Sequence, residues 1–419
     1  MHRIFFSIYD LIYAIGLIFS LPFYGKRLFG KDGRFHDFLE RLGIYCTEIK
    51  ILKNHNIWIH AVSIGELLAI IPLINEISKK FSDRQIVVSC TSRTGRIIAE
   101  QKLSHHIIKI FLPFDFSFAT RKAVFAIKPE IFISVETEIW PNLFFELKRK
   151  NIPVLVLNGR LSRKSFVRYR AFRLIMRNIM NMVDCFVMRS PSDAERLLKL
   201  GVPDEKVLVS KSIKFDHVYQ LSLILNPENN SDRKIVIFGS IHKAEEPHVV
   251  HICKKILDRY KDVVIVIAPR ALEKTSIYHI LETEGIQYDV FSSSKHEKRV
   301  LVLDRYGVLT EFYKKCRVAF VGGSLVPAGG QNPIEPLAFK KPVIYGKFHW
   351  DFEQEWEMIL RAGAGIEVGS FDQLYEKLVF LLDNPEICKE MGEKGFNVIV
   401  ENKGATEQML KVVEKFLSN

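Results

Sequence analysis

The chain has 419 residues, of which 48% are hydrophobic, and it carries a formal net charge of +12 at pH 7. This length can bury more than one hydrophobic core, so two domains are the starting expectation. The positive charge favours anionic partners such as phosphates, acidic sugars, anionic lipids or nucleic acids. The six cysteines are scattered without a CxxC pair, which excludes a zinc site of clustered spacing.

An apolar segment opens the chain. Residues 4–24 read IFFSIYDLIYAIGLIFSLPFY, with one charge at Asp10. A helix needs about 20 apolar residues to span a bilayer. No small-residue cleavage site follows, which argues against a secretory signal peptide. Basic residues come next and favour a cytoplasmic flank, so we expect an N-terminal membrane anchor over residues 1–30. A helix lying in the membrane interface is the alternative.

Short runs rich in Val and Ile alternate with amphipathic stretches along the rest of the chain. The runs are 57–60, 85–90, 107–111, 131–135, 154–158, 184–188, 234–239, 263–268, 299–303, 317–321 and 342–346. Such runs are typical of strands buried on both faces of a parallel sheet. The polar segment 226–234, NPENNSDRK, is the best linker candidate. The pattern predicts an α/β protein with two Rossmann-like domains, 31–225 and 226–400, facing a cleft.

Carboxylates follow two strands of the first domain, where ligands bind in parallel sheets. Glu66 comes after the run 57–60, where it would stabilise the first turn of a helix or act as a general base. Glu136 and Glu138 come after the run 131–135 and precede Trp140-Pro141. One of the two could cap a helix that starts near Pro141, and the other would then serve the site.

Glycine-rich and basic loops follow strands of the second domain. Gly239-Ser240 and Pro269-Arg270 resemble loops that offer backbone N–H groups and a guanidinium to an anion. After the run 317–321, the pairs Gly322-Gly323 and Gly329-Gly330 permit close approach of backbone to a ligand. We expect Asn332-Pro333 to open a helix with Glu335 in its first turn, a setting that suits a phosphate and ribose hydroxyls.

Common nucleotide and metal motifs are absent from the sequence. It contains no GxGxxG and no GxxxxGK[ST], so dinucleotide and P-loop readings are weak. It also lacks Asp-x-Asp, the usual divalent-metal ligand of many sugar-nucleotide transferases. We therefore expect neither a metal nor a cofactor, with basic side chains and helix termini stabilising a leaving phosphate.

A basic segment interleaved with aromatic residues lies at 160–177. Its cations are Arg160, Arg163, Lys164, Arg168, Arg170, Arg173 and Arg177. A solvated basic helix is one interpretation. The preferred one is an anionic lipid surface or phosphorylated acceptor, because the expected anchor already places the domain at a membrane. The same anchor argues against a nucleic-acid partner.

The ordered motifs resemble those of the Kdo (3-deoxy-D-manno-octulosonic acid) transferases over nearly the whole chain. They are HAVSIGE (60–66), PFD (113–115), SVETEIWPN (134–142), NGRLS (158–162), SIKFD (212–216), FGSIHKAEE (238–246), APR (268–270), LDRYGVLTEFY (303–313) and FVGGSLVPAGGQNPIEP (320–336).

This resemblance implies a GT-B glycosyltransferase architecture, with a C-terminal helix (401–419) packing back on the N-terminal domain. It implies inverting, metal-independent transfer of Kdo from CMP-Kdo to a lipid A precursor, lipid IVA, in lipopolysaccharide inner-core biosynthesis. The catalytic domains would lie on the cytoplasmic side of the bacterial inner membrane. Glu66 would be the general base, with Glu136 and Lys214 supporting the transition state.

The resemblance also implies a donor site in the second domain. The residues expected to hold CMP are Pro269, Arg270, Gly307, Val308, Leu309, Asn332, Pro333, Ile334 and Glu335. Further donor contacts are expected at Gly239, Ser240, Gly322 and Gly323.

Two other functions stay open at this point. One is another GT-B sugar-nucleotide enzyme, a transferase or an epimerase, which the HAVSIGE and ETEIWPN motifs disfavour. The other is a catalytically silent binding protein at the membrane, which intact Glu66, Glu136 and Lys214 disfavour.

Overall fold

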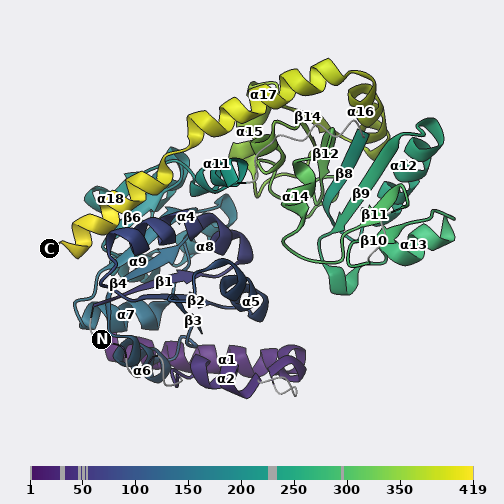
Figure 1. Cartoon of the computed structure of the whole chain (residues 1–419). Coiled ribbons are helices and arrows are strands. Elements are labelled where there is room, and N and C mark those ends of the chain that lie inside the picture. Colours follow the sequence, from purple (N-terminus) through teal and green to yellow (C-terminus); the bar gives the residue numbers. More distant parts are fainter. Residues whose placement is uncertain are drawn as a thin grey trace. The chain divides into compact units, whose positions relative to one another are not determined.

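A computed structural model describes residues 2–28, 34–45, 49, 52, 55–224, 234–293 and 297–418. The chain forms two compact units, unit 1 (Met1–His217 with Lys403–Asn419) and unit 2 (Val218–Asn402). Each unit contains a seven-stranded sheet flanked by helices (Figure 1). Except for Lys234, the expected linker 226–234 lies outside the described residues.

The sheet of unit 1 has the order β3-β2-β1-β4-β5-β6-β7, and its paired strands are parallel. The strands are β1 (Asn56–Ala61), β2 (Ile86–Cys90), β3 (Ile108–Phe111), β4 (Pro129–Val135), β5 (Val154–Gly159), β6 (Cys185–Met188) and β7 (Val207–Val209). The helices are α1 (His2–Leu28), α2 (Arg34–Arg41), α4 (Ile64–Lys80), α5 (Arg93–Lys102), α6 (Ser117–Ile127), α7 (Pro141–Arg149), α8 (Arg163–Ala171), α9 (Arg173–Met180), α10 (Pro191–Lys199), the 3₁₀ turn η1 (Asp204–Lys206) and α18 (Ala405–Leu417), while α11 (Ile213–Ile224) begins in unit 1 and ends in unit 2.

The sheet of unit 2 is also parallel, in the order β10-β11-β9-β8-β12-β13-β14. The strands are β8 (Lys234–Ile241), β9 (Val263–Pro269), β10 (Asp289–Val290), β11 (Val300–Val302), β12 (Val318–Val321), β13 (Val343–Gly346) and β14 (Gly365–Val368). The helices are α12 (Glu246–Arg259), α13 (Ile277–Thr283), α14 (Leu309–Tyr313), α15 (Glu353–Arg361), α16 (Phe371–Asp383) and α17 (Pro385–Asn402), with 3₁₀ turns η2 (Leu272–Lys274) and η3 (Pro336–Phe339).

Every expected strand run forms a strand, with ends shifted by at most a few residues. The runs of β1, β2 and β5 show why, since every residue in them is buried. The sequence prediction missed β7, β10 and β14. These strands are short and partly exposed, so their sequences lack the continuous apolar run that marked the others.

Two hydrophobic cores cover the two faces of the unit 1 sheet. One joins β1, β2 and β4 to α4 and α5, and it includes Ala405, Met409 and Val413 of the C-terminal helix α18. The other joins the same sheet to α6, α7, α9 and α10. The end of the chain therefore completes a core built mainly from its beginning.

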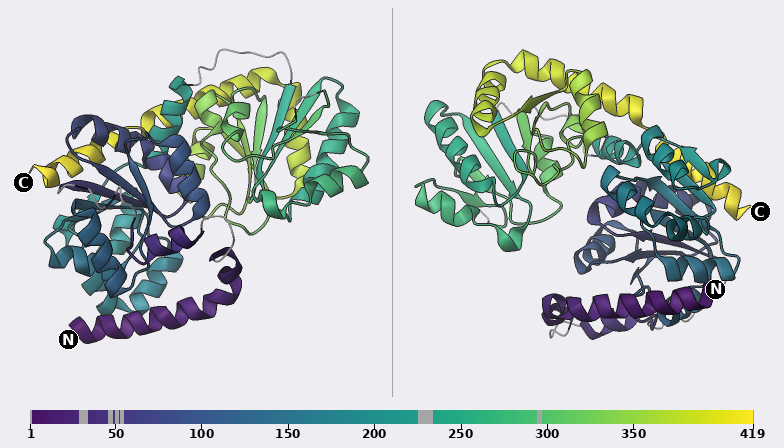
Figure 2. Two further views of the ribbon diagram at one scale, coloured as in Figure 1. Left: turned by 60° about the horizontal axis from the view of Figure 1, so that its bottom comes forward. Right: turned by 180° about the vertical axis from the view of Figure 1, so that it is seen from behind.

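Helix α1 occupies the segment expected to be a membrane anchor. No helix in the described parts of the chain is long and apolar enough to cross a membrane. Figures 1 and 2 show α1 running along the outside of unit 1 beside α2. Asp10, the single charge of this segment, accepts hydrogen bonds from the Ser117 amide (3.1 Å) and from Asn142 Nδ2 (2.7 Å). The charge that interrupts the apolar run therefore ties α1 to the N-termini of α6 and α7.

Two helices receive their N-terminal cap from a carboxylate far away in the chain. Asp115, of the PFD motif, accepts hydrogen bonds from the first amides of α7, Asn142 (3.2 Å) and Leu143 (2.9 Å). The sequence suggested Glu136 or Glu138 as the cap of α7. That prediction is wrong, because Asp115 caps the helix. Asp216 similarly accepts the amides of 404–406 at the start of α18, at 3.1–3.3 Å.

Candidate active site

Glu66 lies in the first turn of α4, directly after the carboxyl end of β1. The Ser63 side chain caps the helix by accepting the Glu66 amide (3.1 Å), and Glu66 Oε2 accepts the Val62 amide (2.8 Å). The side chain is nearly enclosed, with 7% of the residue exposed. Glu66 therefore does stabilise the first turn of α4, as one of the two interpretations predicted. This role uses one carboxylate oxygen, Oε2, which accepts the Val62 amide.

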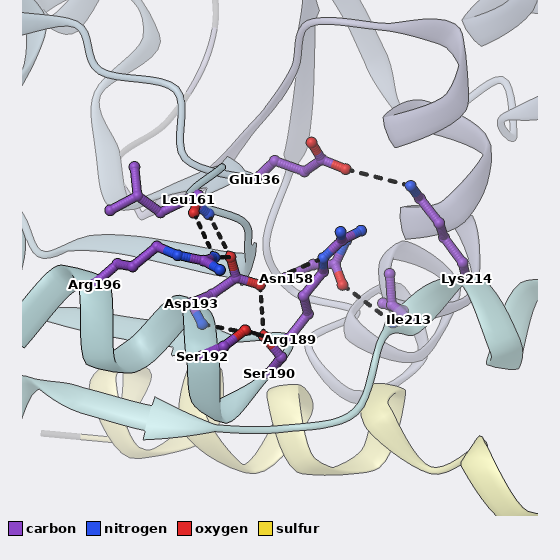
Figure 3. Close-up of polar contacts among 10 residues, drawn as sticks. All are labelled: Glu136, Asn158, Leu161, Arg189, Ser190, Ser192, Asp193, Arg196, Ile213 and Lys214. Atoms are coloured by element: carbon purple, nitrogen blue, oxygen red, sulfur yellow. Dashed lines mark hydrogen bonds and ion pairs between the residues drawn. The ribbon is translucent and has the colours of Figure 1, made fainter. Parts of the chain in front are cut away.

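Glu136 and Lys214 meet at the same edge of the sheet. Glu136 follows β4, the neighbour of β1, and adopts the left-handed backbone with φ 59°. Its Oε1 lies 3.7 Å from Lys214 Nζ, and the two side chains are 19% and 14% exposed. Figure 3 shows the two side chains pointing toward each other, Glu136 from the loop after β4 and Lys214 from the first turn of α11. Three residues selected from separate motifs therefore gather at one edge of unit 1.

The negative charge of Glu136 acts on the two neighbouring carboxyls, Glu66 and Glu138. Burial, then the charge of Glu136 and that of Glu138, raise the pKa of Glu66 to about 7, against two hydrogen bonds that lower it. Burial and the Glu136 charge also raise the pKa of Glu138. A carboxylate with a pKa near neutrality can accept a proton from a hydroxyl and release it again at physiological pH. The neighbouring ammonium can hold an anionic group.

In unit 2, the expected donor residues meet near the carboxyl ends of β9 and β12. Arg270 follows β9 and is exposed, and its charge acts on the half-buried Glu335. Asn332 Nδ2 donates to Glu335 Oε1 (3.1 Å). The turn Gly307-Val308 leads into α14, which packs against η3 next to these residues. Gly307 has φ 81° and open space where a Cβ would stand, so a side chain there is disfavoured by the backbone alone.

The expected helix at Asn332-Pro333 does not form. Asn332 Oδ1 instead accepts the Ile334 amide (3.2 Å), a local turn typical of asparagine. A 3₁₀ turn of four residues starts only at Pro336, and it ends at Lys340 in the left-handed backbone. Prolines at 333 and 336 remove two amide donors from this stretch. A helix N-terminus that could bind phosphate is therefore not present at Asn332.

Close packing of protein against protein accounts for the glycines at 322 and 323. A Cβ on Gly322 would lie 2.6 Å from the Ser240 carbonyl oxygen, and one on Gly323 would lie 2.9 Å from His242 Nε2. The Gly323 amide donates to the buried Glu245 carboxylate (2.7 Å). The Gly239 and Ser240 positions lie within β8, whose register shifts between Phe238 and Ile241. Their contact with a donor stays a prediction.

Glu245 organises this region and was missed by the sequence reasoning. It is completely buried and also accepts the amides of His242 (2.9 Å) and Leu325 (3.2 Å). The signal was available in the FGSIHKAEE motif, because a carboxylate so close to a strand end needs partners if it is buried. Within the described ranges, no group of three or more His, Cys, Asp or Glu side chains is arranged to hold a metal ion.

Two units, each with a parallel sheet flanked by helices and polar side chains at its carboxyl edge, are typical of the GT-B-like fold. A UDP-GlcNAc 2-epimerase from Neisseria meningitidis has a TM-score of 0.58 at 15% identity, covering 86% of this chain and all of that chain (100%). A glycosyltransferase from Rickettsia africae has a TM-score of 0.59 at 15% identity, covering 88% of this chain and 100% of that one. These likenesses concern the fold alone.

Sequence comparison narrows the class to one family. A family model described as 3-deoxy-D-manno-octulosonic-acid transferase (kdotransferase) matches residues 36–217. The 3-deoxy-D-manno-octulosonic acid transferase of Haemophilus influenzae is 30% identical over 388 residues, covering 90% of this chain and 91% of the relative. The 3-deoxy-D-manno-octulosonic acid transferase of Chlamydia pneumoniae is 28% identical, and the match covers 94% of this chain and 92% of the relative. The chain belongs to the Kdo transferase family, and it is a glycosyltransferase of lipopolysaccharide biosynthesis.

Proposed function

We propose that this enzyme transfers Kdo from CMP-Kdo to a hydroxyl of a lipid A precursor, lipid IVA, with inversion and with Glu66 as general base. The acceptor oxygen attacks the anomeric carbon of Kdo while Glu66 takes its proton. The bond from that carbon to the phosphate oxygen breaks, and its electron pair leaves with CMP. One displacement step of this kind inverts the anomeric centre.

The enclosed carboxylate of Glu66 is the observation that carries this proposal. A sugar hydroxyl is a poor nucleophile, and a positioned base typically contributes about 10²–10⁴-fold. Glu66 combines burial with a pKa raised to about 7, and it lies near Glu136, which in turn faces Lys214. Lys214 would stabilise negative charge that develops on the departing phosphate or on the Kdo carboxylate.

Donor binding is proposed for unit 2. The Arg270 guanidinium suits the phosphate of CMP. Glu335, held by Asn332, suits the vicinal hydroxyls of the ribose, as an acceptor of their hydrogen bonds. The turn at Gly307–Leu309 and the segment Asn332–Glu335 would complete the nucleotide contacts.

Product analysis tests this function directly. Purified protein is incubated with CMP-Kdo and tetraacylated lipid A precursor, and the lipid products are weighed by mass spectrometry. We expect the acceptor to gain mass in steps of one Kdo residue, with an equal amount of CMP released. Release of CMP without a change in the lipid, or transfer only from another nucleotide sugar, would contradict the proposal.

The proposed place of action is the cytoplasmic face of the inner membrane, with α1 lying in the interface rather than spanning it. The side chains of Ile8, Leu11, Ile12, Ile15, Ile18 and Phe19 are 46–75% exposed. They recur at helical spacing, opposite Tyr9, Asp10 and Tyr13, which contact the body of unit 1. An apolar stripe of this length with a docked polar face suits an interfacial helix.

The basic segment of α8 and α9 supports the same location. No residue of α8 is buried, and Val167, Phe172 and Leu174 are 59–80% exposed among the arginines. Exposed apolar side chains between cations match an anionic lipid surface, where each basic residue contributes about 1 kcal/mol.

Placing a charge in the α1 stripe should weaken membrane binding. We expect Ile12→Glu to lower co-sedimentation with vesicles of anionic phospholipid by at least about 10-fold, because burying an isoleucine is worth about 1.5–3 kcal/mol. Phe380→Glu, on the 43% exposed Phe380 of unit 2, is the matched control and should bind normally. Equal binding by Ile12→Glu and wild type would remove α1 from the membrane interface.

The pH dependence of turnover should report the state of Glu66. A protonated carboxyl cannot accept the hydroxyl proton, so kcat should fall as pH drops below about 7. The measurement is kcat at saturating substrates from about pH 5 to about pH 9. An acid limb near 4.5, the ordinary value for glutamate, would show that the base is not this buried carboxyl.

A further inference from the structure

Lys214 is part of a closed ring of contacts that also includes Asn158, Ile213 and Glu136. Asn158, the second-to-last residue of the strand β5, is completely buried and has a left-handed backbone with φ 55°. Its Oδ1 accepts the amide of Ile213, the first residue of α11, at 3.2 Å. Lys214 is the next residue, and its ammonium lies 3.7 Å from Glu136 Oε1.

The ring closes through the backbone of the neighbouring strand. The Glu136 amide donates to the carbonyl of Leu157 (2.9 Å), which immediately precedes Asn158. Glu136 and Asn158 both occupy the left-handed region, at the ends of the paired strands β4 and β5. Such backbone is kept at a cost only where its surroundings require it. The ring thus connects the carboxylate, the ammonium and the start of α11, and Figure 3 shows two of its contacts, Glu136–Lys214 and Asn158–Ile213.

The segment that carries Asn158 is held independently of Ile213. Asp193 is 2% exposed, and its Oδ1 accepts the Leu161 amide (3.0 Å). Arg196 donates to the Leu161 carbonyl (2.9 Å), and Arg189 lies 3.7 Å from the Asp193 carboxylate. These contacts, drawn in Figure 3, fix the β5–α8 segment from its far side. The position of Asn158 is therefore fixed by contacts that do not involve α11, so that Asn158 can determine where α11 begins.

Helix α11 has a second attachment of its own. Asp216 accepts the amides at the start of α18, so the first turn stays bound to unit 1 without Asn158. Removing the Asn158 acceptor should thus release the first residue of α11 and shift Lys214 without unfolding the unit.

We propose that Asn158 is a positioning residue of the transfer reaction, which sets the place of Lys214 opposite Glu136 by accepting the Ile213 amide. This inference rests on the proposed function. Asn158 touches no reacting group in this role. It acts through the backbone of α11, and its effect is transmitted by Lys214.

Two substitutions separate the hydrogen bond from the backbone conformation. Asn158→Gly keeps the left-handed backbone at no steric cost and loses the acceptor, whereas Asn158→Ala loses both. Asn151→Gly is the matched control, because Asn151 is exposed and has nearly the same φ, 57°. We expect Asn158→Gly to lower kcat by about 10–100-fold. The KM for CMP-Kdo and the melting temperature should stay near those of wild type, and Asn151→Gly should be unaffected.

Two readouts exclude a purely structural role. With Lys214 displaced, less positive charge offsets Glu66, Glu136 and Glu138, so the acid limb of kcat should move to higher pH in Asn158→Gly. In a Lys214→Ala background, Asn158→Gly should cost little more, because both substitutions remove the same positioned ammonium.

Each result decides between the alternatives. If kcat of Asn158→Gly is within about twofold of wild type, or if the two substitutions multiply independently, Asn158 is only a turn residue. An active wild type with an unaffected Asn158→Gly overturns this inference alone. A wild type that transfers no Kdo overturns the proposed function and this inference with it.

Discussion

Replacing Glu66 with glutamine should lower the rate of Kdo transfer by about 10²–10⁴-fold while CMP-Kdo binding is retained. Glutamine is nearly isosteric, and its carbonyl oxygen can still accept the Val62 amide that Glu66 Oε2 accepts now. It cannot accept a proton from the acceptor hydroxyl. The two measurements are the rate of product formation by mass spectrometry and the affinity for CMP-Kdo by calorimetry. Donor binding should be retained because the residues proposed to bind CMP lie in unit 2.

Stability supplies an independent check on the same side chain. The pKa of Glu66 in the folded enzyme, about 7, is above its ordinary value of 4.5, so ionising it disfavours folding. That cost is absent at low pH, grows as pH rises between these values, and is complete above about 7. The melting temperature of Glu66→Gln minus that of wild type should therefore be larger near about pH 8 than near about pH 5.

A control on the same helix separates charge from position. Glu76 also lies in α4, where it pairs with Lys79 and its side chain is 40% exposed. Glu76→Gln should leave both kcat and the pH dependence of stability close to wild type. Normal turnover by Glu66→Gln would end the assignment of Glu66 as the general base.

Replacing Lys214 with alanine should lower kcat by about 10²–10³-fold, the loss found when one preorganised group that stabilises developing charge is removed. The ammonium is largely enclosed, with 14% of the side chain exposed, and it lies 3.7 Å from Glu136 Oε1. The same change should raise the apparent pKa of Glu66, because the site then loses the positive charge that lies 3.7 Å from Glu136.

The measurements are kcat and its acid limb, with Lys199→Ala as control. Lys199 pairs with Glu195 in α10 and its side chain is 60% exposed, so its loss should matter little. A Lys214→Ala enzyme with a large rise in KM for CMP-Kdo and an unchanged kcat would make Lys214 a binding residue instead.

Helix α1 illustrates how a correct local pattern can mislead about context. Its apolar run predicts a helix in contact with lipid, and a helix forms. Asp10 looked like a defect in a spanning segment, yet its partners Ser117 and Asn142 lie far along the chain. Only the packed unit reveals that one face of α1 is docked on protein while the other carries exposed Ile and Phe side chains.

In the segment after β12, a local sequence pattern typical of a helix start forms a turn instead. Asn332-Pro333 carries the sequence signature of a helix start, but Asn332 closes a turn with Ile334. Competition between a side-chain turn and a helix is decided by the surroundings, here by Glu335 and a second proline at 336.

By itself, the sequence determined the α/β class, the buried strands and the chemistry at their ends, because burial on both faces and turn residues leave a local record in each segment. It also determined the family, since many ordered motifs carry that information together. Only the tertiary structure decided that Lys214 meets Glu136, that Asn158 holds the start of α11, and that Asp115 and Asp216 cap remote helices. Those contacts join residues far apart in the chain, and no local periodicity encodes a hydrogen bond that exists only after the sheet has brought its strand ends together.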